Sequence, residues 1–356
     1  MKKAYLTLQN GKTFQGVRFG AEGDVTGELV FTTGMTGYVE TLTDPSYYGQ
    51  IVTQTFPLIG NYGTMSADAE SKKSWVSAYI VREKCDEPSN FRSEGKLDDF
   101  LKKNNVIGLY GIDTRELTKI VRETGVMNAA ITSKPLADFS ELNSYKIENA
   151  VKAVTCDEVE YFGKPDGLRI VVCDLGAKNN IIRELLKRGC YCIKVPAYYT
   201  AEQILALSPQ GLMLTNGPGD PAENVEVIEN IKKIAGKLPI FGICLGHQLF
   251  AIAMGGKTKK MKYGHRGANQ PVKNLFTGRV YVSSQNHGYE VISSSLEGKG
   301  ELSFVNVNDG TCEGVDYPYL NAFTVQFHPE SCGGTRDAVF LFDKFIKNVR
   351  ENKFNA

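Results

Sequence analysis

The feature that most constrains the fold is a cysteine at position 244 that joins an apolar run to a helix-like run. Residues 238–243 are mostly apolar, as in a buried strand, and residues 246–254 resemble a buried helix. A strand that passes into a helix through one sharply turned residue exposes that side chain at the edge of a sheet. Gly242 and Gly246 leave the space that such a turn needs. The pattern therefore predicts an α/β fold with Cys244 at a strand-to-helix elbow.

This position suits a nucleophile. The sulfur of Cys244 would lie beside the first turn of the following helix, where unpaired N–H groups and the helix dipole favour the thiolate. A lone cysteine is more often a buried structural residue than a reactive one. The two flanking glycines and the strand-to-helix context favour the nucleophile here.

Charge and cysteine usage narrow the possible functions. The chain carries 41 basic and 40 acidic residues, which argues against binding to nucleic acid or to a membrane and favours a small-molecule substrate or a protein partner. The N-terminal residues lack the apolar core of a signal peptide, so we expect a cytoplasmic protein. The eight cysteines show no Cys-x-x-Cys pair and no zinc-like spacing with histidine. We therefore expect reduced thiols and no metal site.

A polar, irregular stretch over residues 132–167 divides the 356 residues, a length typical of two domains. We expect a mixed α+β N-terminal domain over 1–150, in which Asp113 caps a helix, and a linker over 151–167. In the C-terminal domain, 168–356, short apolar runs alternate with helical segments, as in parallel βαβ units.

A base for the cysteine is offered by His328-Pro329-Glu330 at the end of a predicted strand. Residues i and i+2 of a strand point to the same side, so the Glu330 carboxylate can orient the His328 imidazole. An isolated His-x-Glu sequence is as often structural, but Cys244 requires a base. The remaining histidines fit less well, because one lies on the elbow helix facing away from the sulfur and two lie among glycines and turn residues: His247, His265 and His287.

Two glycine-containing segments lead to opposite conclusions. The Asn216-Gly217-Pro218-Gly219 segment could hold an oxyanion together with the N–H of Leu245, although a plain turn explains it equally well. The segment 255–258 resembles the end of a phosphate-binding loop, but the required leading glycine is absent. We expect no ATP site in this chain.

The run from Gly242 to Gln248 with the later His328-Pro329-Glu330 resembles the triad, or class I, glutamine amidotransferases. In the first half, residues 33–38, 43–47, 57–63 and 111–115 look like the N-terminal domain of carbamoyl-phosphate synthase small chains. The resemblance implies a glutaminase subunit that forms a thioester on Cys244. It would pass ammonia to a large ATP-dependent chain that makes carbamoyl phosphate from bicarbonate for arginine and/or pyrimidine biosynthesis.

The same resemblance implies a flavodoxin-like, mostly parallel sheet flanked by helices in the C-terminal domain. It also implies that the large chain is the heterodimer partner and binds ATP and magnesium, while this chain holds no cofactor. Cys244, His328 and Glu330 would be the catalytic triad. The implied contacts to L-glutamine come from the residues Ser46, Gly217, Gly219, Leu245, Gln248, Asn286, Gly288 and Tyr289.

One segment departs from the family, which usually continues after the triad with alanine and a Gly-Pro pair. This chain has Ser331-Cys332-Gly333-Gly334-Thr335 instead, which leaves the conformation of that loop open. Two other interpretations also stay open. One is a stand-alone Cys/His hydrolase, which would give no reason for the N-terminal half, and the other is a non-catalytic interaction subunit.

We predict that Ser46→Ala raises KM for glutamine several-fold and leaves ammonia-dependent synthesis unchanged. A serine hydroxyl on glutamine contributes about 0.5–1.5 kcal/mol to binding, and free ammonia does not use that contact. Steady-state kinetics with each nitrogen source would test this. A structure with bound glutamine in which Ser46 lies outside contact range would contradict it.

Overall fold

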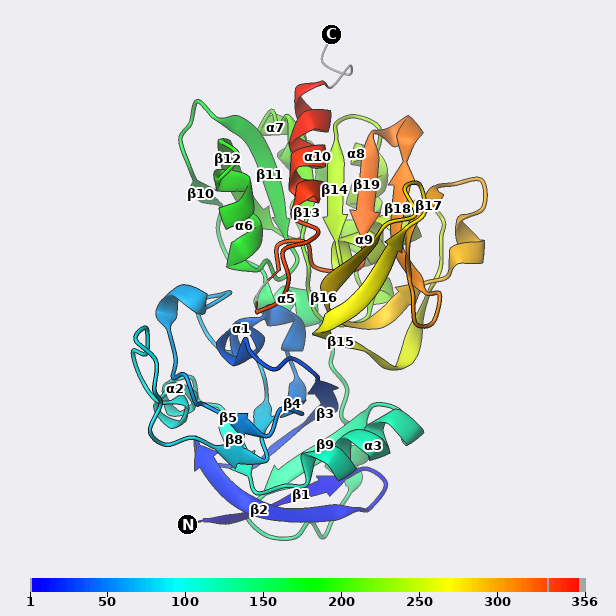
Figure 1. Ribbon diagram of the computed structural model, residues 1–356. Helices are drawn as coiled ribbons and strands as arrows, with labels where there is room; N and C mark the ends of the chain where they lie inside the picture. The colour runs from blue at the N-terminus through cyan, green and yellow to red at the C-terminus, as the bar shows by residue number, and fades with distance from the viewer. Residues whose placement is uncertain (1, 332, 352–356) are drawn as a thin grey trace. The chain divides into compact units, whose positions relative to one another are not determined.

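The computed structural model describes residues 2–331 and 333–351. The chain divides into two compact units, Met1–Glu148 and Asn149–Ala356 (Figure 1). Within the described residues, no helix has the length and apolar character needed to cross a membrane. Each unit is built around its own buried clusters of apolar side chains, and each is described separately below.

The first unit is a closed barrel with the strand order β1-β2-β8-β6-β4-β3-β9. Alternate residues of β1, such as Leu6 and Leu8, are fully buried in its core. The barrel strands are β1 Lys3–Leu8, β2 Thr13–Gly20, β3 Val25–Thr32, β4 Gln50–Gln54, β6 Ala78–Ile80, β8 Ile107–Tyr110 and β9 Met127–Thr132. The small sheet beside it pairs β5 Leu58–Ile59 with β7 Glu83–Lys84.

Short helices lie between the barrel strands and after the last of them. Those between the strands are α1 Tyr38–Thr43, the 3-10 helices η1 Pro45–Tyr47 and η2 Ser66–Asp68, α2 Leu97–Lys103 and α3 Thr114–Thr124, and α4 Ser140–Ser144 follows β9. Helix α3 begins where the sequence predicts, because the Asp113 side chain accepts a hydrogen bond from the N–H of Glu116 at 3.0 Å. The predicted Asp113 cap is therefore confirmed.

The second unit contains a ten-stranded sheet, as far as the structure describes it. Its central strands run parallel in the order β12-β11-β13-β14-β19. In chain order this is 2-1-3-4-5, the flavodoxin-like order. The strands are β11 Leu168–Asp174, β12 Cys190–Pro196, β13 Gly211–Leu214, β14 Ile240–Ile243 and β19 Ala322–Val325. The expected fold class is confirmed.

Helices cover both faces of these central strands, which explains their nearly continuous apolar sequences. Figure 1 shows α6 and α10 in front of the strands and α7 and α8 behind them. The alternation along β11 fits this arrangement, because Ile170 and Val172 pack on the α6 and α10 side while Val171 and Cys173 pack on the opposite side. The helices are α6 Asn179–Leu186, α7 Ala201–Ala206, α8 Val225–Ile234, α9 Leu245–Ala253 and α10 Phe340–Arg350.

Antiparallel strands extend this sheet at both ends. Next to β19 they are β18 Cys312–Tyr317, β17 Glu301–Asn306, β15 Thr258–Asn274 and β16 Val280–Val291, and at the opposite edge β10 Glu160–Phe162 pairs with β12. The range 151–167, expected as a linker, differs in the structure. It holds β10 and most of α5 Ala150–Val154, because apolar side chains such as Val151 pack into the core of the second unit.

We predict that Gly246→Ala lowers the free energy of unfolding by about 2 kcal/mol, as in overpacked cores. A Cβ at Gly246 would lie 2.4 Å from the backbone carbonyl oxygen of Leu214, which cannot move without disturbing β13. That clash outweighs the gain of about 1 kcal/mol that alanine brings to a helix. Urea unfolding would measure the loss. Gly95→Ala is the control, because its nearest contact would be the Thr64 hydroxyl at 3.4 Å. Equal stability of the two variants would contradict the prediction.

Candidate active site

Cys244 occupies the turn between β14 and α9 in a backbone conformation that is unusual for a residue with a side chain. Its φ is 55° and its ψ is −103°. Its N–H donates to the carbonyl of Val325 at 2.8 Å, and its own carbonyl accepts from the N–H of Gln248 at 3.1 Å. Backbone strain of this kind persists only where the surroundings hold it, and it clusters at functional sites. The structure thus places Cys244 at the strand-to-helix elbow that the sequence predicts.

His328 follows β19, and its N–H donates to the carbonyl of Ser284 at 2.9 Å. Its Nδ1 lies 2.7 Å from Oε1 of Glu330, and both side chains are buried. The Nε2 atom of His328 is also buried and has no hydrogen-bond partner among the described residues. With Nδ1 donating to the carboxylate, Nε2 is the ring nitrogen that can exchange a proton with a neighbouring group.

Opposing effects act on the pKa of His328. Burial and the charge of Lys178 lower this pKa, but Glu330 and the nearby Cys244 outweigh them and raise it to about 9. The backbone contacts place Cys244 near this imidazole. The N–H of Cys244 donates to Val325, three residues before His328. The sulfur contacts the carbonyl of Asn286, two residues after the Ser284 that binds the N–H of His328. The structure therefore brings the predicted nucleophile, base and orienting carboxylate together.

Lys178 belongs to the same site, although the sequence analysis missed it. Its Nζ lies 2.6 Å from Oε1 of Glu330, and only 6% of its side chain is exposed. Burial raises the pKa of Glu330, but Lys178 and His328 together lower it to about 2. Lys178 directly precedes α6, and its backbone N–H donates to Oδ1 of Asn216 at 3.1 Å. A lysine just after the carboxyl end of a central strand was the available signal.

Several of the predicted glutamine contacts also reach the elbow. The Nε2 of Gln248 donates to the carbonyl of Tyr289 at 2.9 Å. The carbonyl of Asn286 lies 3.7 Å from the sulfur of Cys244. Gly288 lies between these two residues on β16. Strand β16 therefore forms one side of the cysteine site.

The predicted oxyanion loop packs directly on the elbow. A Cβ added to Gly217 would lie 2.8 Å from the Leu245 side chain and 2.1 Å from the carbonyl of Leu175, so only glycine fits there. Gly219 adopts a φ of 88°, which also favours glycine. Gly217 and Leu245 are thus neighbours, while their role in holding an oxyanion stays a prediction.

His247 faces away from the sulfur. Its Nδ1 lies 2.8 Å from the hydroxyl of Thr324, and the ring is fully buried. Burial lowers the pKa of His247 to about 3, so the ring is neutral. This side chain links the elbow helix to β19.

Ser46 lies in the other unit, within η1, and is buried. Its N–H donates to the Asp44 side chain at 2.9 Å. Its contact with glutamine stays a prediction. In the loop after the triad, Cys332 lies outside the described residues, and the carbonyl of Ser331 accepts from Nδ2 of Asn180 at 3.1 Å.

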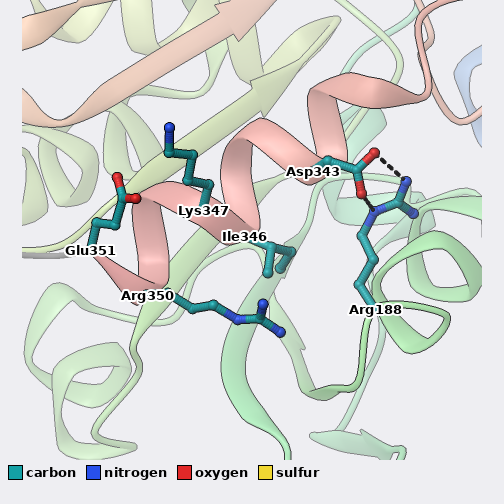
Figure 2. Close-up of a pocket in the computed structure, with 6 residues that line it drawn as sticks. All are labelled: Arg188, Asp343, Ile346, Lys347, Arg350 and Glu351. Carbon is teal, nitrogen blue, oxygen red and sulfur yellow. Dashed lines mark hydrogen bonds and ion pairs between the residues drawn. The ribbon is translucent and has the colours of Figure 1, made fainter.

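Two further features of the second unit lie outside this set of residues. Among the described residues, one group could offer ligand atoms to a metal ion: His265, His287 and Glu313, whose ligating atoms lie within 4.8 Å of one another. Figure 2 shows a surface pocket of about 470 Å³ beside α10, where Arg188 pairs with Asp343 at 2.7 Å. None of its six lining residues is a predicted site residue.

Comparisons with known proteins cover both units. The family model "Carbamoyl-phosphate synthase small chain, CPSase domain" matches residues 6–131, and "Glutamine amidotransferase class-I" matches residues 171–348. A protein of Clostridium perfringens named carbamoyl phosphate synthase small chain is 50% identical, covering 97% of this chain and 99% of that protein. A Bacillus cereus protein of the same name is 51% identical, covering 99% and 97%. A solved glutamine amidotransferase of Thermotoga maritima is 18% identical with a TM-score of 0.37, covering 52% of this chain and 86% of its own.

We predict that Glu330→Gln lowers the free energy of unfolding by about 3 kcal/mol at pH 7, since it removes the carboxylate that pairs with the buried Lys178 cation at 2.6 Å. Lys178→Met in the same chain should restore at least half of that loss. The folded-state pKa of Glu330 falls from 4.5 to about 2, so its carboxylate stabilises the fold fully above pH 4.5 and loses that effect as the pH approaches 2.

Urea unfolding at pH 7 would measure both variants. Glu229→Gln is the control, because its partner Lys232 is 45% exposed and such surface pairs contribute little. A Glu330→Gln protein as stable as the control would show that the buried pair is not required for folding.

Proposed function

The chain belongs to the carbamoyl-phosphate synthase small chains, with a class I glutamine amidotransferase domain, and we propose that Cys244 hydrolyses L-glutamine through a covalent thioester. The observation that carries this proposal is the buried His328–Glu330 pair beside Cys244. In this pair Nδ1 of His328 contacts Glu330, while Nε2 has no hydrogen-bond partner among the described residues. The thiol of Cys244 acts on the same ring, since it raises the pKa of His328. A strained cysteine beside such a histidine has the geometry of an activated nucleophile.

In the first step the Cys244 thiol transfers its proton to Nε2 of His328, and the thiolate attacks the side-chain amide carbon of glutamine. A carbon–sulfur bond forms and the carbonyl oxygen becomes an oxyanion. We propose that backbone N–H groups of Leu245 and the Gly217 loop hold that charge. His328 then returns the proton to the leaving nitrogen, the carbon–nitrogen bond breaks, and ammonia departs from a γ-glutamyl thioester.

In the second step His328 takes a proton from water, and the resulting hydroxide attacks the thioester carbon. The carbon–sulfur bond breaks, glutamate leaves, and the thiolate of Cys244 regains the proton from His328. Glu330 keeps Nδ1 of His328 protonated and the ring oriented in both steps. Lys178 in turn keeps Glu330 ionised, as the lowered pKa of Glu330 indicates.

The polar groups around the Cys244 sulfur suit glutamine as the substrate. Gln248, Asn286 and Tyr289 already meet at the elbow through the contacts described above. We propose that these residues, with Gly217, Gly219, Leu245, Gly288 and Ser46, bind glutamine. Their backbone groups suit a small polar amino acid, which needs several convergent hydrogen bonds.

The fate of the ammonia is a further part of the proposal. Ammonia is protonated in bulk water and then no longer reacts as a nucleophile. We propose that it passes to a large ATP-dependent chain, which forms a heterodimer with this one and makes carbamoyl phosphate from bicarbonate for arginine and/or pyrimidine biosynthesis. ATP and magnesium would be used on the large chain, and no cofactor is needed for the steps above.

We predict that Cys244→Ser abolishes glutamine-dependent carbamoyl phosphate synthesis, while the complex with the large chain still uses free ammonia. Only amide cleavage depends on the thiolate, and a serine hydroxyl at this position lacks its reactivity. Product formation with glutamine and with ammonium chloride would be compared for both proteins. Equal loss with the two nitrogen sources would overturn the proposal. Glutamine hydrolysis without any large chain to receive ammonia would favour the stand-alone hydrolase.

A further inference from the structure

A charged cluster made of the buried His265 and Glu313 and the exposed Asp309 lies next to the glutamine side of β16. On β15, His265 has Nε2 at 2.9 Å from Oδ2 of Asp309 and Nδ1 at 3.4 Å from Oε1 of Glu313. Glu313 is fully buried, and His265 is 8% exposed. The ladder pairs His265 directly with His287 of β16, and the two rings meet edge to face with centroids 5.0 Å apart.

We propose that His265, held between the side chains of Asp309 and Glu313, is a positioning residue that fixes the glutamine-binding segment of β16. This inference rests on the proposed glutaminase function. His265 does not touch the reacting atoms. It acts through His287, on the opposite strand of the hairpin.

The contacts form a continuous path from the cluster to the nucleophile. Nδ1 of His287 donates to the carbonyl of Tyr289 at 2.8 Å. The same carbonyl accepts from Nε2 of Gln248, on the elbow helix. One residue before His287, the carbonyl of Asn286 contacts the sulfur of Cys244. A shift of the His287 ring would therefore disturb two contacts of the glutamine site.

The backbone ladder alone does not fix this segment. The β15–β16 register shifts between Lys260 and His265 and again between Gly267 and Gln270. The short paired stretch around His265 is thus separated from the regular ladder on both sides. Register shifts of this kind interrupt the ladder of backbone hydrogen bonds locally and change the direction of the side chains. Side-chain contacts must then hold the stretch in place, and the charged cluster supplies them.

Polar atoms of neighbouring residues surround the ring of His265. Its two nitrogens face carboxylate oxygens of Asp309 and Glu313, and Nδ1 also lies 3.4 Å from Nδ2 of Asn306. Burial lowers the pKa of His265, but Glu313 and Asp309 outweigh it and raise the pKa above its usual value. Burial also raises the pKa of Glu313, and the contacts from His265 and Asn306 offset this only in part. The ring is therefore held by several polar contacts at once, which fixes its position.

A bound metal ion is the alternative explanation for this cluster, because His265, His287 and Glu313 carry side chains that commonly bind metals. The contacts favour the hydrogen-bonded cluster without a metal. Nδ2 of Asn306 lies 3.4 Å from Nδ1 of His265 and 3.2 Å from Oε1 of Glu313. His287 already contacts the carbonyl of Tyr289 and, through Nε2, the side chain of Gln285 at 3.0 Å. A metal would have to displace these partners.

The test compares glutaminase kinetics of the complex carrying His265→Asn with those of the wild type. We expect KM for glutamine to rise about tenfold and kcat to change less than twofold, as for the loss of one well-aligned binding contact. Asp309→Asn should give a smaller rise in KM. Lys259→Ala is the matched control, since it breaks the 3.0 Å pair with Glu290 on the same two strands and should leave KM unchanged.

A double-mutant cycle separates positioning from general destabilisation. If His265 acts through His287, adding His265→Asn to a His287→Asn protein should raise KM less than twofold further. Full additivity, or an unchanged KM in the single His265 variant, would overturn the inference. A rise in the wild-type KM after dialysis against a zinc chelator would overturn it in favour of a metal site. A wild-type complex that does not hydrolyse glutamine would instead refute the proposed function.

Discussion

The arrangement around Cys244 depends on the carboxylate of Glu330. This carboxylate accepts hydrogen bonds from Nζ of Lys178, which follows β11, and from Nδ1 of His328, which follows β19. These two strands flank β13 and β14 in the sheet, so one buried carboxylate joins the two sides of the edge that carries Cys244. Buried charges are costly unless paired, and this arrangement pairs each member. The result is an imidazole with a fixed ring and a free Nε2.

The elbow holds the proposed nucleophile, Cys244, in a strained backbone conformation. A Cβ on Gly246 would lie 2.4 Å from the carbonyl oxygen of Leu214, and one on Gly242 would lie 2.9 Å from the carbonyl oxygen of Gly246 in the first turn of α9. These contacts press the strand-to-helix turn against the neighbouring strand, which keeps Cys244 at a positive φ. Strain at this position is thus sustained by packing elsewhere in the sheet.

The antiparallel strands β15 to β18 supply further contacts around Cys244. They are not needed to complete the parallel core, yet they bring Asn286 and Tyr289 to the sulfur and to Gln248. The irregular register around His265 makes this part of the sheet depend on side-chain charges rather than on the ladder alone. The proposed glutamine-binding residues and the His328–Glu330 pair are therefore held by separate polar networks that meet at β16.

Local patterns in the sequence were enough to determine the parallel α/β core, the elbow at Cys244, the Asp113 cap and the pairing of His328 with Glu330. Each depends on residues that are neighbours along the chain, so spacing alone encodes them. Only the tertiary structure revealed Lys178, which lies 152 positions before Glu330 in the sequence printed. It alone also showed His265 between Asp309 and Glu313, because that cluster requires β15, β17 and β18 to pair in a register shaped by bulges. Such contacts between distant segments leave only a weak local signal, since many sequences place a lysine after a strand or a histidine near a glycine.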